Sequence, residues 1–352
     1  MAPPEPAAPV TGLRWPAEWE PHDATWLAWP HKEASWPGKF ERVPPVFVEM
    51  VRALVPGERV EILVRDGAME SAVAARLAEA RLAGADVRLH RIATDDAWIR
   101  DHGPTFVVDE AARELLAVDW DYNAWGGKYP PWESDARVAR AIAEIVGCSS
   151  RQPRLILEGG SIEGDGEGTL LTTESCLLNR NRNPALDRAA IEQHLRAALG
   201  VSTILWLGDG IAGDDTDGHV DDLTRFVAPG RVVTVLEDDP RDVNYNTLRA
   251  NRERLVALRD ARGRQLDVIP LPMPAPVLEV QDRLPASYAN FYIGNEAVLV
   301  PVFGCSADRE AMGILGELFP GRRVTGIPAR DLVWGLGACH CLTQQQPRVP
   351  AL

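Results

Sequence analysis

Apolar residues recur along the chain with the 3.6-residue period of an amphipathic helix in five stretches, at 69–83, 134–146, 184–199, 245–262 and 307–319. A short β-rich run follows each stretch, at 86–92, 154–157, 202–207, 265–271 and 322–327. Further strand-like runs precede several of the helices, at 106–108, 115–120, 170–172, 176–178, 291–293 and 297–302. The pattern predicts five units of strands, helix and strand, which share an arrangement but few letters.

Two α/β architectures fit five such units. They could stack as one doubly wound sheet or close radially as a propeller, and periodicity alone leaves both open. We expect residues 13–348 to form a single domain. The proline-rich stretch 1–12 lacks the basic start and apolar centre of a secretory signal, so it is interpreted as a disordered tail.

The composition excludes several classes of partner. The 352 residues carry a formal net charge of −14, which argues against nucleic acid and anionic membranes and suits a cationic small molecule. No run approaches the ~18 consecutive apolar residues of a membrane span. Five cysteines in so long a chain do not form a disulfide framework, and their odd number favours a reducing cytoplasm.

A polar loop follows each pair of helix and strand. These loops contain TDDAWIRDHGP at 94–104, EGGS at 158–161, GDGIAGDDTDGHVDD at 208–222, PAPVLEVQD at 274–282 and a glycine-rich stretch before Cys341. Ligands bind at the carboxyl ends of strands in α/β architectures. Because these ends would meet near the axis of a closed ring, we expect carboxylates, one histidine and one cysteine to share a site.

Five side chains in these loops could act on one substrate: Asp101, Glu158, His219, Asp221 and Cys341. Carboxylates forced into one cavity repel each other unless a cation neutralises them. A planar guanidinium offers five N–H donors that match carboxylate oxygens in pairs, and its central carbon stays open to a thiolate. In an extended segment His219 and Asp221 share a face, so the imidazole could pass protons while the carboxylate binds substrate.

Each candidate also has a structural interpretation. Arg100 could form a structural ion pair with a neighbouring carboxylate. Glu158 could accept hydrogen bonds at a turn, and His219 could be an ordinary satisfied polar residue. Three further acids of the third loop are interpreted as solvated: Asp214, Asp215 and Asp217.

The C-terminal loop holds two cysteines. In an extended segment Cys339 shares a face with Cys341 and is a rival nucleophile. His340 faces the other way, which disfavours it as the direct partner of Cys341. A Cys-x-Cys pair with no second pair is a poor zinc signature.

Six longer segments stand out along the chain: WIRDHGP, WDYNAWGGKYPPW, LEGGSIEGDGEGTLLTTESCLLNRNRNP, WLGDGIAGDDTDGHVDDLTRFVAPG, ASYANFYIGNEAVLVPVFG and HCLTQQQP. Together they resemble agmatine deiminases. The likeness keeps the same order from about residue 14 to residue 347. The wider family includes bacterial peptidylarginine deiminases and belongs to the guanidine-modifying superfamily. The resemblance implies a five-bladed, pseudo-symmetric α/β propeller, the pentein fold.

The resemblance also implies roles for single residues. Cys341 is similar to the nucleophile that forms an amidino-cysteine intermediate, and His219 to the general acid/base. Asp101 and Asp221 resemble the pair that clamps the guanidinium, and Glu158 resembles the acid that orients the histidine and helps to hold the substrate. The implied substrate-binding residues are Asp96, Trp98, Trp125 and Gly337.

The reaction implied by the resemblance is hydrolysis of agmatine to N-carbamoylputrescine and ammonia, in putrescine and polyamine biosynthesis, with no metal or organic cofactor. Family members form dimers or tetramers, so a homo-oligomer is expected. A deiminase of peptidyl-arginine or free arginine with the same catalytic residues is the main alternative. A metal-dependent hydrolase and a non-catalytic cation-binding protein are the rivals from other classes.

Overall fold

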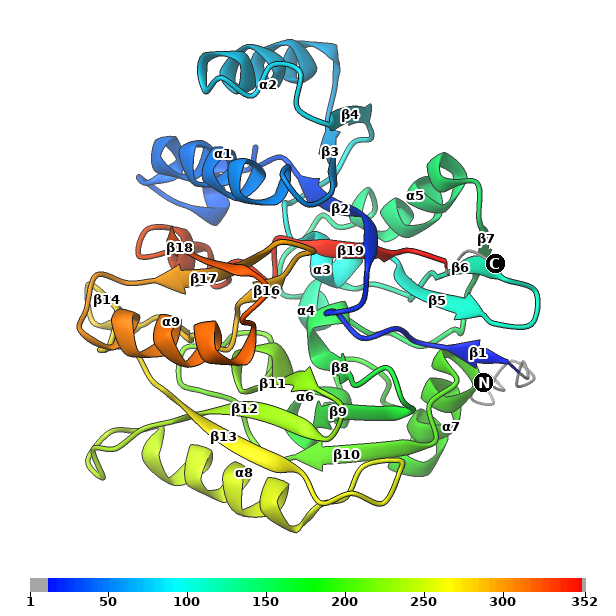
Figure 1. The fold of residues 1–352 in the computed structure, drawn as a ribbon, viewed down its shortest axis with the longest axis vertical. Helices are drawn as coiled ribbons and strands as arrows, with labels where there is room; N and C mark the ends of the chain where they lie inside the picture. Colours follow the sequence, from blue (N-terminus) through cyan, green and yellow to red (C-terminus); the bar gives the residue numbers. More distant parts are fainter. Residues whose placement is uncertain (1–11, 350–352) are drawn as a thin grey trace.

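The computed structural model describes residues 12–349 of the 352. Residues 1–11 of the predicted tail therefore lie outside the described residues. The domain limits at 13 and 348 stay a prediction. Five sheets of three or four strands are set around the middle of the molecule (Figure 1). A separate two-stranded ribbon pairs β14 (Leu278–Glu279) with β15 (Asp282–Arg283). Sheets arranged radially leave few exposed edges, which is the architecture of a propeller.

Four of the five sheets are built in the same way. Two strands pair antiparallel, and a third returns through a crossover helix to lie parallel to the second. The first sheet contains β5 (Thr105–Asp109), β6 (Glu114–Val118), α5 (Val138–Val146) and β7 (Ser149–Arg151), with β1 (Leu13–Arg14) at its edge. The other three are β8 (Ile162–Gly164), β9 (Thr169–Thr173), α7 (Arg188–Leu199), β10 (Thr203–Leu207); β11 (Thr224–Ala228), β12 (Arg231–Leu236), α8 (Tyr245–Ala257), β13 (Asp267–Pro272); and β16 (Tyr292–Ile293), β17 (Ala297–Val302), α9 (Ala307–Leu318), β18 (Arg323–Pro328).

The fifth sheet joins the two ends of the chain. β19 (Gln344–Pro347) pairs antiparallel with β2 (His22–Ala28), and β3 (Arg59–Val64) and β4 (Val87–Arg91) follow in parallel. Its crossover helices are α1 (Val43–Leu54) and α2 (Gly67–Glu79). The last strand therefore completes the sheet that the first long strand begins, and backbone hydrogen bonds close the ring.

The first predicted unit is one helix and one strand larger than expected. α1 and β3 precede the predicted helix at 69–83, which is α2. Pro44 lies in the first turn of α1, where the N–H that proline lacks would have no helical partner in any case. Val46, Phe47 and Met50 of α1 are buried, so packing against the sheet stabilises this helix.

Two strand predictions are wrong. The run 154–157 makes only an isolated bridge between Asp121 and Ile156, and the strand after α5 is the earlier β7. The run 176–178 begins inside α6 (Glu174–Leu177), whose first turn is capped by the Thr173 hydroxyl accepting a bond from the Cys176 backbone N–H. Short apolar runs fit a strand and a helical turn equally well, and here the cap decides.

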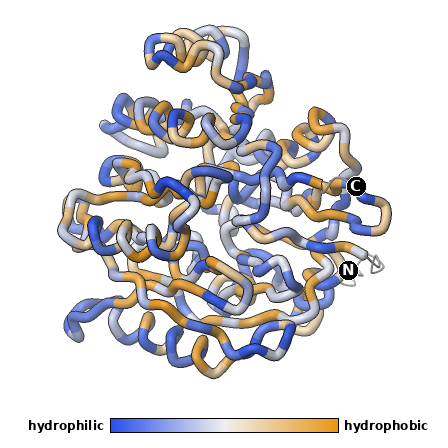
Figure 2. Tube along the Cα trace, in the orientation of Figure 1, coloured by the Kyte–Doolittle hydropathy of each residue, from blue (hydrophilic) through white to orange (hydrophobic). Residues whose placement is uncertain are grey.

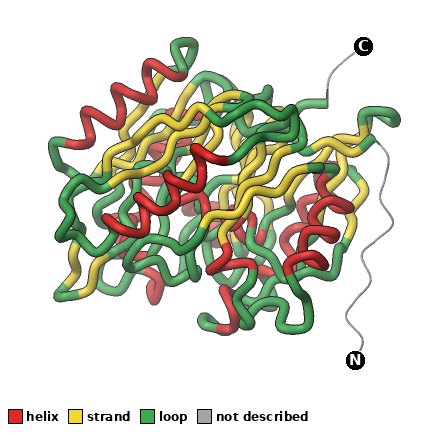
Figure 3. The backbone as a smooth tube through the Cα atoms, turned by 90° about the horizontal axis from the view of Figure 1, so that it is seen from below, coloured by secondary structure: helices red, strands yellow, loops and turns green. Residues whose placement is uncertain are grey.

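Apolar side chains fill the space between sheets and helices. The strands are hydrophobic over long stretches in Figure 2, and five successive residues of β17 are buried. The longer helices lie against the strands in Figure 3, and α9 buries only Ala311 and Leu315. Strands covered on both faces are apolar throughout, whereas helices on the outside are apolar on one stripe.

Candidate active site

A cavity of about 780 Å³ has Cys341 and Asp101 on its wall. The four residues predicted to bind substrate all line the same cavity: Asp96, Trp98, Trp125 and Gly337. A Cβ atom built on Gly337 would lie 2.6 Å from a ring carbon of Trp98 and 3.0 Å from the Cβ of Cys341. Only glycine therefore fits between this indole and the predicted nucleophile.

Loops that follow four of the parallel strands carry the catalytic candidates. Asp101 lies on the short helix α3 (Ile99–His102) after β4, and Glu158 follows β7. His219 follows β10, and Cys341 follows β18. All four side chains are buried. The prediction that strand-end loops bring these residues together is borne out by the distances below.

Asp101 is held by two donors from different segments. Its Oδ1 accepts a bond from the Gly160 backbone N–H and its Oδ2 accepts one from the Trp125 indole N–H, both at 2.9 Å. Burial and the neighbouring carboxylates raise its pKa, although His219 opposes this. The carboxylate is therefore fixed in position, and a further positive charge beside it would favour its ionised form.

His219 lies between two acids. Its Nδ1 is 3.8 Å from Asp101 Oδ1, and its Nε2 is 3.7 Å from Glu158 Oε2. Burial disfavours the charged imidazole, but the Asp101 carboxylate and the neighbouring Cys176 and Glu158 outweigh it and hold the pKa of His219 well above its usual value. The surroundings of His219 therefore favour the imidazolium form, which is the form that can donate a proton.

Glu158 is completely buried and anchored by an arginine that the sequence reasoning missed. Arg182 Nε donates to Glu158 Oε1 at 3.0 Å. Burial would raise the pKa of Glu158, but His219 and Arg182 beside it lower the pKa below its usual value. Glu158 is the residue before a short 3-10 helix, and its side chain makes no cap there. Its backbone carbonyl accepts bonds from the Ser161 N–H at 3.0 Å and the Ser161 hydroxyl at 2.6 Å, so the turn-acceptor interpretation holds for the backbone but not for the carboxylate.

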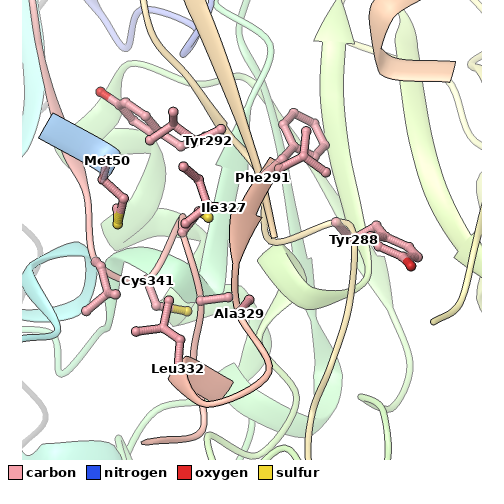
Figure 4. Close-up of a cluster of buried hydrophobic side chains, with 14 of the residues drawn as sticks. Met50, Tyr288, Phe291, Tyr292, Ile327, Ala329, Leu332 and Cys341 are labelled. Carbon is pink, nitrogen blue, oxygen red and sulfur yellow. The ribbon is translucent and has the colours of Figure 1, made fainter. Parts of the chain in front are cut away.

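Cys341 belongs to the buried apolar cluster of Figure 4, beside Leu332 and Ala329. Its Sγ accepts a bond from Asn290 Nδ2 at 3.0 Å and lies 3.7 Å from Asp221 Oδ2. Burial, followed by the charges of nearby aspartates, raises the pKa of the Cys341 thiol well above its usual value. These surroundings favour the protonated thiol, and added positive charge near the sulfur would favour the thiolate.

Cys339 is not a rival nucleophile in this geometry. It is fully buried, it is not among the residues that line the cavity, and burial raises the pKa of its thiol. The prediction of a shared face required an extended segment, but the chain turns here, with the Thr343 N–H donating to the His340 carbonyl at 3.1 Å.

The predicted extended segment at His219 and Asp221 is also wrong. Val220–Asp222 form a 3-10 helix with His219 just before it. Both side chains nevertheless meet at Gly160, where a built Cβ atom would lie 2.7 Å from His219 Nδ1 and 2.9 Å from Asp221 Oδ2. A helical turn thus brings the two groups together without the alternation of a strand.

Asp221 is bound by His340, a residue that the sequence reasoning set aside. Asp221 Oδ2 lies 2.7 Å from His340 Nδ1, and His340 Nε2 lies 2.9 Å from Glu18 Oε2. Because both ring nitrogens bind carboxylates, His340 has no nitrogen left for Cys341, as expected.

Arg100 forms a structural ion pair, as its alternative interpretation predicted, but with a distant partner. Its Nη2 donates to Glu18 Oε2 at 3.1 Å, and its Nη1 donates to Gln345 Oε1 at 2.7 Å. The guanidinium therefore ties the chain before β2 to the chain around Cys341.

The acidic loop before His219 is structured, which corrects its interpretation as a solvated loop. Asp214 Oδ2 accepts a bond from the His219 backbone N–H at 3.0 Å. Asp217 forms an ion pair with Arg182, the same residue that anchors Glu158. Through Asp214 and Asp217, this loop connects the backbone of His219 to Arg182, the residue that anchors Glu158.

Three buried atoms at this site have no hydrogen-bond partner among the described residues: Glu158 Oε2, His219 Nε2 and Asp221 Oδ1. Buried polar atoms are rarely left without a partner, so such a group points to a ligand or water. The two carboxylate oxygens can only accept hydrogen bonds at neutral pH. A small cation rich in N–H donors would satisfy them.

One group of side chains within residues 12–349 has donor atoms close enough for a metal ion. The atoms of Glu158, Cys176 and His219 lie within 4.8 Å of one another. Arg182 already occupies the other oxygen of Glu158, and a proton competes for the imidazole because the pKa of His219 is raised. These donors therefore suit proton transfer better than metal binding.

The chain matches the family described as Porphyromonas-type peptidyl-arginine deiminase over residues 14–347, and it belongs to that family. The agmatine deiminase of Ectopseudomonas mendocina is 43% identical to this chain, in an alignment that covers 96% of each protein. The agmatine deiminase structure from Enterococcus faecalis has a TM-score of 0.89 at 34% identity and covers 98% of this chain and 100% of that one. A substrate-bound, cysteine-to-serine agmatine deiminase from C. jejuni has a TM-score of 0.87 at 28% identity and covers 97% of this chain and 99% of that one. These matches confirm the predicted five-bladed pentein propeller.

Proposed function

We propose that this chain is an agmatine deiminase, which hydrolyses agmatine to N-carbamoylputrescine and ammonia through a covalent intermediate on Cys341. The observation that carries the proposal is the set of buried, unpartnered atoms around the thiol: Asp221 Oδ1, Glu158 Oε2 and His219 Nε2. A guanidinium supplies planar N–H donors for the two oxygens and positive charge for the acids. The near end-to-end match to agmatine deiminases supports the same activity here.

Substrate binding prepares the nucleophile. Asp101 and Asp221 clamp the guanidinium, and its charge offsets the negative field that keeps Cys341 protonated. The pKa of the thiol falls, and Asn290 Nδ2 already donates to the sulfur that becomes the thiolate. Trp98 and Trp125 on the cavity wall pack against the four-carbon chain of agmatine.

The chemistry then takes two half-reactions on the same cysteine. The Cys341 thiolate attacks the central guanidinium carbon, and the His219 imidazolium gives its proton to the departing ammonia. The product of this step is a positively charged amidino-thioether. The neutral His219 then takes a proton from water, and the hydroxide adds to the same carbon. The C–S bond breaks as the added hydroxyl gives its proton to the departing sulfur, which releases N-carbamoylputrescine and restores the Cys341 thiol and the His219 imidazolium.

The charges on the cavity wall favour agmatine over free arginine. Arginine carries an α-carboxylate that needs a cation, whereas agmatine ends in an ammonium. Each of the three cations on the described wall is already paired with a carboxylate: Lys32 with Asp96 at 3.4 Å, Lys128 with Asp215 at 3.2 Å and Arg283 with Asp242 at 2.6 Å. Binding the α-carboxylate would therefore require one of these pairs to break.

Ammonia release tests the proposal directly. The purified protein is assayed with agmatine, free arginine and a blocked arginyl peptide, and we expect kcat/KM to be highest for agmatine. The matched control is Cys341→Ala, which should give no release, while mass spectrometry of the quenched wild-type reaction should show an adduct at Cys341. Turnover of the arginyl peptide but not of agmatine would refute the substrate, and full activity in Cys341→Ala would refute the mechanism.

Assembly as a dimer or tetramer and a cytoplasmic location stay predictions, the first drawn from the family resemblance and the second from composition. Light scattering after gel filtration would check the first against the mass of one chain. Of the helices described within 12–349, none is long and apolar enough to cross a bilayer.

A further inference from the structure

A chain of three buried side chains leads from the N-terminal segment to the predicted substrate clamp. Glu18, His340 and Asp221 are 4%, 1% and 0% exposed. Glu18 Oε2 lies 2.9 Å from His340 Nε2, and His340 Nδ1 lies 2.7 Å from Asp221 Oδ2. Glu18 belongs to the blue chain between β1 and β2, which passes the middle of the molecule in Figure 1.

The partners of His340 decide its protonation. An ionised carboxylate accepts hydrogen bonds and donates none, so each ring nitrogen must carry a hydrogen to bond its partner. With both carboxylates ionised, this geometry requires the imidazolium form of the ring. The surroundings balance this charge, because three buried carboxylates face three buried cations: Glu18, Glu163 and Asp221 against Arg100, Arg225 and His340.

The backbone of residue 340 is fixed as firmly as its ring. Its N–H donates to Asn290 Oδ1 at 3.0 Å, and its carbonyl accepts a bond from Arg100 Nε at 3.3 Å. Asn290 also donates to the sulfur of the next residue, Cys341. The position of the nucleophile and the position of Asp221 are therefore set by one rigid group.

We propose that His340 is a positioning residue, an imidazolium that is anchored on Glu18 and holds Asp221 by one oxygen so that the other is left for the substrate. Asp221 Oδ2 is occupied by the ring, whereas Asp221 Oδ1 is buried with no partner. Without the imidazolium the carboxylate could rotate, and its charge would be uncompensated on that side. The proposal rests on the proposed function, because the substrate is taken to be a guanidinium that binds Asp221.

Two substitutions separate the roles of the two ring nitrogens. In His340→Asn the side-chain amide takes the place of Nδ1 and can donate to Asp221. In His340→Gln it takes the place of Nε2 and can donate only to Glu18. Since a hydrogen bond to a charged group is strong, we expect kcat/KM for agmatine to fall about 10- to 100-fold in His340→Gln, chiefly through a higher KM, and by less than about fivefold in His340→Asn.

The matched control is His194→Asn, at a buried histidine whose Nδ1 bonds the Pro153 carbonyl. It should lower stability and leave kcat and KM unchanged. Equal losses in both His340 variants, with KM unchanged and the unfolding midpoint lowered, would show a purely structural role and overturn the proposal. A wild-type protein inactive on agmatine but active on another guanidinium compound would refute the proposed substrate instead, and the comparison would be made with that compound.

A second measurement needs no variant and no turnover. Neutron diffraction from wild-type crystals at neutral pH should show deuterium on both ring nitrogens of His340. A bare nitrogen facing either Glu18 or Asp221 would overturn the proposal even if neither substituted protein folds.

Discussion

Gly160 leaves no room for a side chain among three catalytic candidates. A Cβ atom at this position would lie 2.7 Å from His219 Nδ1, 2.8 Å from Asp101 Oδ1 and 2.9 Å from Asp221 Oδ2. Ordinary contact of a Cβ atom begins at 3.4 Å, so these groups must move apart by roughly half an ångström or more. The backbone of Gly160 lies outside the left-handed region, so an alanine there is strained only by this contact.

Gly160→Ala should therefore harm catalysis far more than folding. A misplacement of about 1 Å costs about 100-fold in rate, so a shift of about half that size should lower kcat/KM for agmatine by about 10- to 100-fold. Overpacking costs about 1–3 kcal/mol of stability, which leaves a protein of ordinary stability folded. Ammonia release against agmatine concentration measures the first quantity, and urea unfolding measures the second.

The control makes the same change where space is open. Gly313 lies within α9, and a Cβ atom built there meets nothing within 4 Å. Gly313→Ala should keep wild-type kcat/KM and gain about 0.5–1 kcal/mol of stability, because alanine loses less entropy in a helix. A Gly160→Ala enzyme with kcat/KM close to that of wild type would refute the crowding of the three groups around this glycine.

Three further predictions follow from buried charges. Arg225→Ala removes the cation paired with buried Glu163 and one of the cations around Glu18, so it should lower the free energy of unfolding by about 3–5 kcal/mol in urea titrations. Arg241→Ala, at an exposed pair, should not change the midpoint. Burial raises the pKa of Asp135 to about 8 from an ordinary 3.8, so the folded state binds the extra proton. The free energy of unfolding should fall as pH rises from about 4 to 8, by up to about 1.4 kcal/mol per pH unit. Asp135→Asn should make this pH dependence weaker, and a stronger pH dependence in the variant would contradict the reasoning. Asn290→Asp replaces the amide that donates to Cys341 by a carboxylate, which should disfavour the thiolate. Turnover and iodoacetamide alkylation of Cys341 at pH 7 should therefore both slow about tenfold or more. Faster alkylation in the variant would show that the amide does not stabilise the thiolate.

The candidate catalytic residues could be picked out from the sequence, but the residues that hold them in place could not. Asp101, Glu158, His219 and Cys341 each follow a strand, and strand ends meet at ligand sites. Their anchors give no comparable local signal. Glu18 is 322 residues from its partner His340 along the chain, and no spacing rule connects them.

Local conformation was the least predictable feature of the site. Both alternation arguments, at 219–221 and at 339–341, assumed extended chain, and both segments turn instead. Segments of three residues are too short for a period to separate strand from turn. Hydrogen bonds from other loops decide their shape, as the bond from the His219 N–H to Asp214 shows.

The sequence by itself determined the five repeating units, the acidic character and the residue types of the reactive loops, because periodicity, charge and composition are local properties of the chain. Periodicity could not choose between a stacked sheet and a closed ring, which only the family resemblance implied, because that choice depends on β19 pairing with β2 at opposite ends of the chain. Only the tertiary structure decided which oxygens are already bonded and which are free for a ligand. A carboxylate's role depends on the donors around it, and those donors come from loops far apart in the sequence.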